Sequence, residues 1–116
     1  PFVEGEPGVA AVMTAAERGA YISHDFIGSQ FWVGWVGDNS NERHFELLDA
    51  LVDAGYEDQL MIGSDTGWFD PGTPEFLIEP YDQIMTDFVP FLRDQGYSEE
   101  LINKFLHDNP WAAYSR

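Results

Sequence analysis

An aspartate follows a short apolar run near the middle of the chain. The run covers residues 60–64, and the acid is Asp65, after which a long loop rich in glycine, proline and aromatic residues begins. A run of this length, bounded by turn residues, is typical of a strand buried on both faces of a parallel sheet. In α/β barrels the carboxyl ends of the strands carry the chemistry, because the loops there surround one pocket. Asp65 is therefore a candidate metal ligand or general base; the alternative is that it caps a turn or a following helix.

A second acid has the same relation to a second predicted strand. Residues 20–23 form a short apolar run that ends in His24-Asp25. Adjacent parallel strands lie about 4.8 Å apart, so carboxylates at their ends can share a metal, a water or a hydrogen-bond network. Because side chains alternate along a strand, His24 would face the helices if Asp25 faces this mouth. His44 and His107 fall in predicted helices, where we expect surface or half-buried side chains.

The order of the predicted elements indicates an α/β fold with two consecutive strand–helix units of a parallel sheet. Asn39 with Glu42 predicts a capping box, Pro90 predicts a kink or restart of its helix, and Ser98 predicts the cap of the last helix. We see no second domain, so residues 1–116 are expected to form a single segment. The predicted helices cover residues 9–18, 39–54, 81–95 and 99–107.

Two loops of the predicted fold contain exposed aromatic residues among glycines and prolines. They cover residues 28–40, with Trp32 and Trp35, and residues 66–80, with Trp68 and Phe69. Loops of this length inside compact domains are uncommon and tend to be functional. Such aromatic residues either cover a pocket or pack against a partner.

Composition excludes several classes of function. The 116 residues include 21 Asp and Glu but 5 Lys and Arg, which gives a formal net charge of −16. So acidic a protein is not expected to bind nucleic acid or an anionic membrane, since both require positive charge. The chain has no cysteine, so thiolate metal sites and disulfides are impossible. No membrane span or signal peptide is visible, and we expect a cytoplasmic location.

Four segments resemble the phosphotriesterase family of the amidohydrolase superfamily, which includes the phosphotriesterase-like lactonases and aryldialkylphosphatases. Residues 55–65 (GYEDQLMIGSD) resemble the closing strand of that family, in which a D-x-G-Y-like turn leads into an I-x-x-S-x-D strand. Residues 18–25 (RGAYISHD) resemble its seventh strand, residues 89–96 (VPFLRDQG) its I-P-x-L-x-x-x-G helix, and residues 109–110 its terminal N-P. The resemblance implies the C-terminal portion of a TIM (β/α)8 barrel, with strands 7 and 8, their helices and a terminal helix.

The resemblance also implies a chemistry and a set of site residues. Members hydrolyse organophosphate esters or lactones with two divalent metals, zinc or otherwise cobalt, manganese or iron, bridged by hydroxide and a carboxylated lysine. Asp65 matches the aspartate that ligates one metal and shuttles a proton. Phe26 departs from the His or Arg common at its position and makes the pocket more apolar. The implied substrate-binding residues are Asp25, Phe26, Trp32, Trp35, Trp68 and Phe69.

The remaining metal ligands of the family have no counterparts in the sequence. These are the paired histidines of strand one, the carboxylated lysine and the histidines of strands five and six. We therefore expect the remainder of the barrel to be encoded upstream of Pro1, and the complete enzyme to be a homodimer acting on a small ester or lactone. The alternative is a non-catalytic acidic α/β module that binds a partner through its tryptophan-rich loops.

Overall fold

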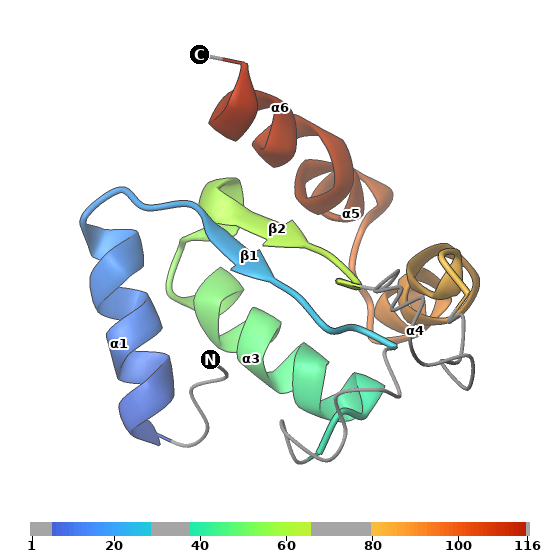
Figure 1. Cartoon of the computed structure of the whole chain (residues 1–116). Coiled ribbons are helices and arrows are strands. Elements are labelled where there is room, and N and C mark those ends of the chain that lie inside the picture. The colour runs from blue at the N-terminus through green and yellow to red at the C-terminus, as the bar shows by residue number, and fades with distance from the viewer. Residues whose placement is uncertain (1–5, 29–37, 66–79, 116) are drawn as a thin grey trace, which may run out of the picture.

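Two parallel strands lie at the centre of the molecule (Figure 1). The structure, a computed structural model, describes residues 6–28, 38–65 and 80–115. Strand β1 (Ile22–His24) pairs with β2 (Leu60–Ile62), with Ile22 opposite Leu60 and His24 opposite Ile62. The parallel pairing agrees with the sequence prediction, although β1 begins two residues later than predicted and β2 ends two residues earlier.

Helices flank the strand pair on both sides in Figure 1. Helix α1 (Glu6–Glu17) packs against β1 and against α3 (Asn41–Asp53), and the 3₁₀ turn η1 (Glu57–Gln59) leads into β2. The π-helical turn η2 (Ile84–Phe88) continues as α4 (Val89–Asp94). Helix α5 (Glu99–Asn103), the π-helical turn η3 (Lys104–Asp108) and α6 (Asn109–Tyr114) run together, and η3 and α6 pack against β2. None of the helices in the described ranges is long and apolar enough to cross a membrane.

The hydrophobic core fills the space between the strands and these helices. Its side chains come from α3, β2, η2, α4, α5 and η3 and from Ile27 after β1. Burying each contributes about 1.5–3 kcal/mol to the free energy of unfolding. Met85 of η2 lies outside this core, with 57% of the residue exposed. The core residues are Ile27, Leu48, Leu51, Leu60, Phe88, Val89, Leu92, Ile102 and Phe105.

A π-helical turn precedes each proline of the C-terminal helices. Pro90 follows η2 and Pro110 follows η3, each within the first turn of the next α-helix. Proline lacks an N–H, and its ring collides with the carbonyl four residues earlier in a regular α-helix. A wider turn before the proline relieves that collision, and the chain continues as helix. The restart at Pro90 was predicted; the predicted end of the last helix at His107 is wrong, because the helix continues to Tyr114.

Helix α3 is capped by Ser40 rather than by the predicted Asn39. The Ser40 hydroxyl accepts a hydrogen bond from the backbone N–H of Arg43 at 3.2 Å, so the predicted pairing of Asn39 with Glu42 is wrong. Both residue types are good caps. Asn39 is unavailable for capping because its side-chain amide binds elsewhere in the fold. Ser98 caps α5 as predicted.

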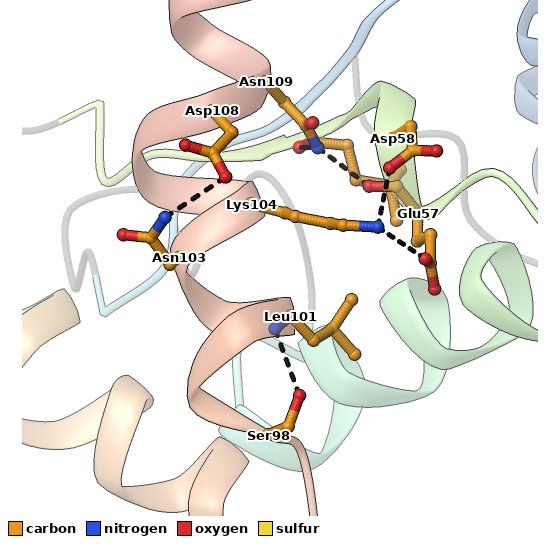
Figure 2. Close-up of polar contacts among 9 residues, drawn as sticks. Glu57, Asp58, Ser98, Leu101, Asn103, Lys104, Asp108 and Asn109 are labelled. Carbon is orange, nitrogen blue, oxygen red and sulfur yellow. Dashed lines mark hydrogen bonds and ion pairs between the residues drawn. The ribbon is translucent and has the colours of Figure 1, made fainter.

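A polar clamp joins the terminal helix to the start of β2 (Figure 2). Asn109 is buried, and its Nδ2 donates to the carbonyl oxygens of Leu60 at 2.7 Å and Glu57 at 2.8 Å. Beside it, Lys104 Nζ lies 2.6 Å from Glu57 Oε1 and 2.8 Å from Asp58 Oδ1. These contacts hold η1 and the first residue of β2 against the terminal helix, and so help to set the position of the strand.

Candidate functional site

The carboxyl ends of β1 and β2 carry the two predicted aspartates. Asp25 directly follows β1, and Asp65 lies three residues beyond β2 and is exposed. The backbone of Asp65 has φ 46°, in the left-handed region that non-glycine residues adopt rarely and that is concentrated at functional sites. Because the strands are parallel neighbours, both acids belong to one edge of the sheet, as the sequence predicted.

A β-bulge forms the backbone around Asp25. Gly63 donates its N–H to the His24 carbonyl at 3.0 Å, and its own carbonyl accepts from the N–H of Ile27 at 3.2 Å. Asp25 and Phe26 therefore lie opposite one residue of the neighbouring strand, and Phe26 takes φ 69° to accommodate the extra residue. Bulges of this kind occur next to active sites, where they re-aim a side chain.

Gly63 makes room for the carboxylate of Asp25. A Cβ atom at position 63 would lie 2.3 Å from Asp25 Oδ1, a separation that real side chains do not tolerate. The same oxygen accepts a hydrogen bond from Ser23 Oγ at 2.9 Å, which places Ser23 and Asp25 on one face of the strand. The carboxylate is thus held between a hydroxyl donor and the backbone of the strand that leads to Asp65.

His24 lies on the opposite face and contacts α3, as the alternation predicted. Its Nε2 is 2.6 Å from Nδ1 of His44, and the two rings meet edge to face with centroids 4.9 Å apart. His44 Nε2 lies 2.8 Å from Asn39 Oδ1, and Asn39 Nδ2 donates to the Phe26 carbonyl at 2.9 Å. The four residues form a continuous polar chain from the bulge, through α3, back to β1.

The prediction of a surface or half-buried His44 is wrong, because only 1% of the residue is exposed. Sequence reasoning also missed a role for Asn39. A signal for His44 was available: it shares helical spacing with Leu48 and Leu51, which form the buried face of α3. His107 is exposed, in agreement with its prediction.

His44 is buried and His24 is half-buried, and both are neutral at physiological pH. Burial, followed by the electrostatic effects of His44 and Arg43, lowers the pKa of His24 to about 3. Burial also lowers the pKa of His44 to about 4, with Asp38 opposing and Arg43 reinforcing the shift. The charged form of either ring would lose solvation at these positions, which favours the neutral form.

Stability should therefore fall as the pH is lowered below the ordinary histidine pKa of 6.5. In that range the unfolded state binds protons that the folded histidines, with pKa values of about 3 and 4, do not bind. The free energy of unfolding keeps its full value well above pH 6.5. Below that pH it decreases by up to about 1.4 kcal/mol per pH unit for each histidine. We expect urea unfolding to show a loss of about 3 kcal/mol between pH 7.5 and 5.5.

Two glutamine variants test this expectation. His44→Gln should reduce the slope of stability against pH by about half, since one of the two rings is removed. His107→Gln changes an exposed ring and should preserve the slope. An unchanged slope in His44→Gln would mean that the buried ring is protonated in the folded protein.

The described residues offer one metal ligand and not a complete set. Within residues 6–28, 38–65 and 80–115, no group of three or more His, Cys, Asp or Glu residues is arranged to hold a metal ion. An exposed carboxylate at a strand end, such as Asp65, fits the role of a single ligand whose partners come from other strands. The predicted substrate-binding residues Trp32, Trp35, Trp68 and Phe69 lie outside the described ranges.

Comparison with known proteins places this geometry in a family. The model of the "Phosphotriesterase family" matches residues 4–114. The chain is 28% identical over 113 residues to "N-acetyltaurine hydrolase" of Tetraodon nigroviridis, covering 94% of this chain and 31% of that protein. It is 26% identical over 104 residues to "Phosphotriesterase homology protein" of Escherichia coli K12, covering 85% of this chain and 32% of that protein.

Solved structures show the same arrangement. The chain superposes on a mutant of the PTE-like lactonase from Deinococcus radiodurans with a TM-score of 0.74 and 26% identity, covering 90% of this chain and 34% of that one. The E. coli phosphotriesterase homology protein complexed with phosphate gives a TM-score of 0.68 at 25% identity, with the same coverage. These neighbours are TIM barrels, so the strand–helix units described above are part of such a barrel. The chain spans about a third of the length of these relatives.

Proposed function

Because this chain belongs to the phosphotriesterase family, we propose that it is part of the barrel of a metal-dependent hydrolase and supplies the strand-8 aspartate, Asp65. The family relatives are hydrolases by name, which supports a hydrolase-type function. The observation that carries the proposal is the placement of Asp25 and Asp65 at the carboxyl ends of adjacent parallel strands. In a barrel these ends surround the active-site mouth.

Asp65 would hold one of two divalent metals, zinc or otherwise cobalt, manganese or iron. Such metals, when bound, polarise a carbonyl or phosphoryl oxygen and acidify water. The carboxylate of Asp65 would accept the proton of the attacking water and pass it on as the leaving group departs. The other ligands would come from the remainder of the barrel, consistent with relatives about three times as long as this chain.

The bulge would form one wall of the substrate pocket. Asp25 would orient a polar group of the substrate, while Phe26 and the aromatic residues Trp32, Trp35, Trp68 and Phe69 would bind its apolar part. An apolar wall separates substrates that differ by one methylene by about 1–3 kcal/mol. We propose a phosphotriester or a lactone as the substrate class; an N-acyl amide, the class named for several relatives, is the third candidate.

The test requires the complete protein that contains this chain. It should be purified, analysed for zinc, cobalt, manganese and iron, and assayed with an aryl dialkyl phosphate, a lactone and N-acetyltaurine. We expect about two metals per chain and hydrolysis of at least one substrate, lost on chelation and regained when metal is returned. Hydrolysis that resists complete removal of metal would contradict the proposal.

A second candidate is a non-catalytic acidic module that binds a partner through the tryptophan-rich loops. The observation that favours it is the single candidate ligand among the described residues. A folded complete protein that binds no metal and hydrolyses none of the three substrates would select this alternative.

Gly63→Ala should impair substrate binding by moving Asp25. The added methyl group would lie 2.3 Å from Asp25 Oδ1, so the carboxylate must rotate away. Since displacement of a positioning group by about 1 Å can cost up to a hundredfold, we expect KM to rise about tenfold with kcat changed less. The control is the same change made in an Asp25→Ala protein. There Gly63→Ala should have no further effect, and a full additive effect would show that the two positions act independently.

A further inference from the structure

The side chains of Asn39, His44 and His24 form a hydrogen-bond chain that begins and ends at the residues on either side of Asp25. Asn39 bonds the carbonyl of Phe26, the residue after Asp25, and His24, the residue before it, ends the hydrogen-bond chain. We propose that Asn39, His44 and His24 are positioning residues, which form a hydrogen-bond chain of fixed direction that holds the β-bulge carrying Asp25. The link to substrate binding rests on the proposed function; the direction of the chain does not.

One backbone carbonyl determines the direction of every bond. The Phe26 carbonyl can only accept, so Asn39 presents its Nδ2 to that oxygen at 2.9 Å and its Oδ1 to the ring of His44. Because Oδ1 also only accepts, His44 must carry its proton on Nε2. The proton-free Nδ1 of His44 then accepts from Nε2–H of His24. Both rings are thus assigned as neutral Nε2–H tautomers.

Burial and charge around the rings support this assignment. His44 is 1% exposed, packs against Phe88, and is neutral because burial lowers its pKa. Among the described residues, Arg43 acts on both rings and Asp38 acts on His44. A protonated His44 would have a donor on each nitrogen and would oppose the Nε2–H of His24, so the chain requires a neutral His44.

The hydrogen-bond chain holds the bulge in place, which apolar packing alone would not do. Phe26 has φ 69°, a conformation that is unfavourable for a non-glycine residue unless its surroundings enforce it. The bond from Asn39 enforces it from one side, and the ladder bonds of Gly63 enforce it from the other. Apolar residues at positions 39 and 44 would fill the same volume but would leave the Phe26 carbonyl without this donor.

The tautomers can be measured directly by long-range ¹H–¹⁵N spectra of the complete protein labelled at histidine. We expect His24 and His44 in the wild type to show one protonated nitrogen each, Nε2, at pH 7. An Nδ1–H tautomer or a doubly protonated ring at either position would overturn the proposal. This measurement requires no variant.

Asn39→Asp tests whether the bonds act as one chain. A carboxylate cannot donate to the Phe26 carbonyl and favours a protonated His44. His44 would then present Nδ1–H to His24, and His24 should switch to its Nδ1–H tautomer. Asn103→Asp is the matched control, since Asn103 is exposed and bonds only Asp108 among the contacts described; it should leave both tautomers unchanged. A protonated His44 beside a His24 that keeps its Nε2–H tautomer would show that the bonds are independent and overturn the chain, as would a neutral His44 with its proton on Nδ1.

Activity measurements separate this inference from the proposed function. If the protein is a hydrolase, Asn39→Asp should raise KM several-fold more than it lowers kcat, and it should have little effect when Asp25 is already Ala. An unchanged KM in an active Asn39→Asp protein would overturn the positioning of Asp25. Absence of hydrolysis in the wild type, with the expected tautomers, would count against the proposed function alone.

Discussion

Asp65→Asn in the complete protein should lower kcat about a hundredfold or more while leaving the fold intact. In the proposed mechanism this change removes a metal ligand and a proton acceptor together. Asp65 is exposed, so the core does not depend on its charge. Asparagine also tolerates the left-handed backbone that Asp65 adopts at φ 46°. The thermal midpoint should therefore stay within a few degrees of wild type.

The measurement should be made on protein saturated with metal, so that a lost ligand is distinguished from a lost metal. Asp58→Asn is a suitable control, because Asp58 is an exposed acid near the other end of β2 and bonds Lys104. It should keep kcat close to wild type. Near-normal turnover in metal-replete Asp65→Asn would refute the assignment of Asp65, and the residue would then be a turn or helix cap.

Asn109→Ala should produce the largest loss of stability among the polar residues described. The variant leaves the carbonyls of Leu60 and Glu57 without the donor that bonds both of them in a buried site (Figure 2). Leaving a buried acceptor unsatisfied costs about 1–3 kcal/mol. For two acceptors we expect the free energy of unfolding to fall by about 2–4 kcal/mol, measured in urea.

Asn103→Ala provides the matched comparison on the same run of helix. Asn103 is exposed, and its Nδ2 donates to Asp108 at 3.2 Å. Exposed bonds of this kind compete with water, so the free energy of unfolding should change by less than about 0.5 kcal/mol. Equal effects of the two variants would mean that water replaces the buried donor of Asn109 and that the clamp does not secure β2.

The local patterns of the chain were sufficient to predict most elements. Apolar runs ending in Asp25 and Asp65 predicted two parallel strands, and glycine and serine signals predicted helix boundaries. These predictions succeed because apolar periodicity and the Ser98 cap depend on residues close in sequence. The predicted cap of α3 at Asn39 was wrong because the choice of cap depends on a residue far away in the sequence. Asn39 and Ser40 are both good caps, and the distant Phe26 carbonyl decides which one is left to cap α3.

The C-terminal helix was also mispredicted for a physical reason. Pro110 signals a break in an α-helix, but a π-helical turn before it lets the helix continue, and Asn109 gains a buried site against β2. The contact is formed across about fifty residues of sequence. Packing against the strand therefore determined how the backbone passes Pro110.

Short motifs and periodicity were enough to predict the family, the parallel strand–helix order and the positions of the two candidate acids. The burial of His44, the bonds that hold the bulge at Phe26, and the room that Gly63 leaves for the Asp25 carboxylate became visible only in the folded structure. Each of those features depends on atoms far apart in the chain: Asp25 Oδ1 against Gly63, and the ring of His24 against that of His44. Contacts of this kind arise from the packing of β1 against β2 and α3, and residue spacing alone does not predict them.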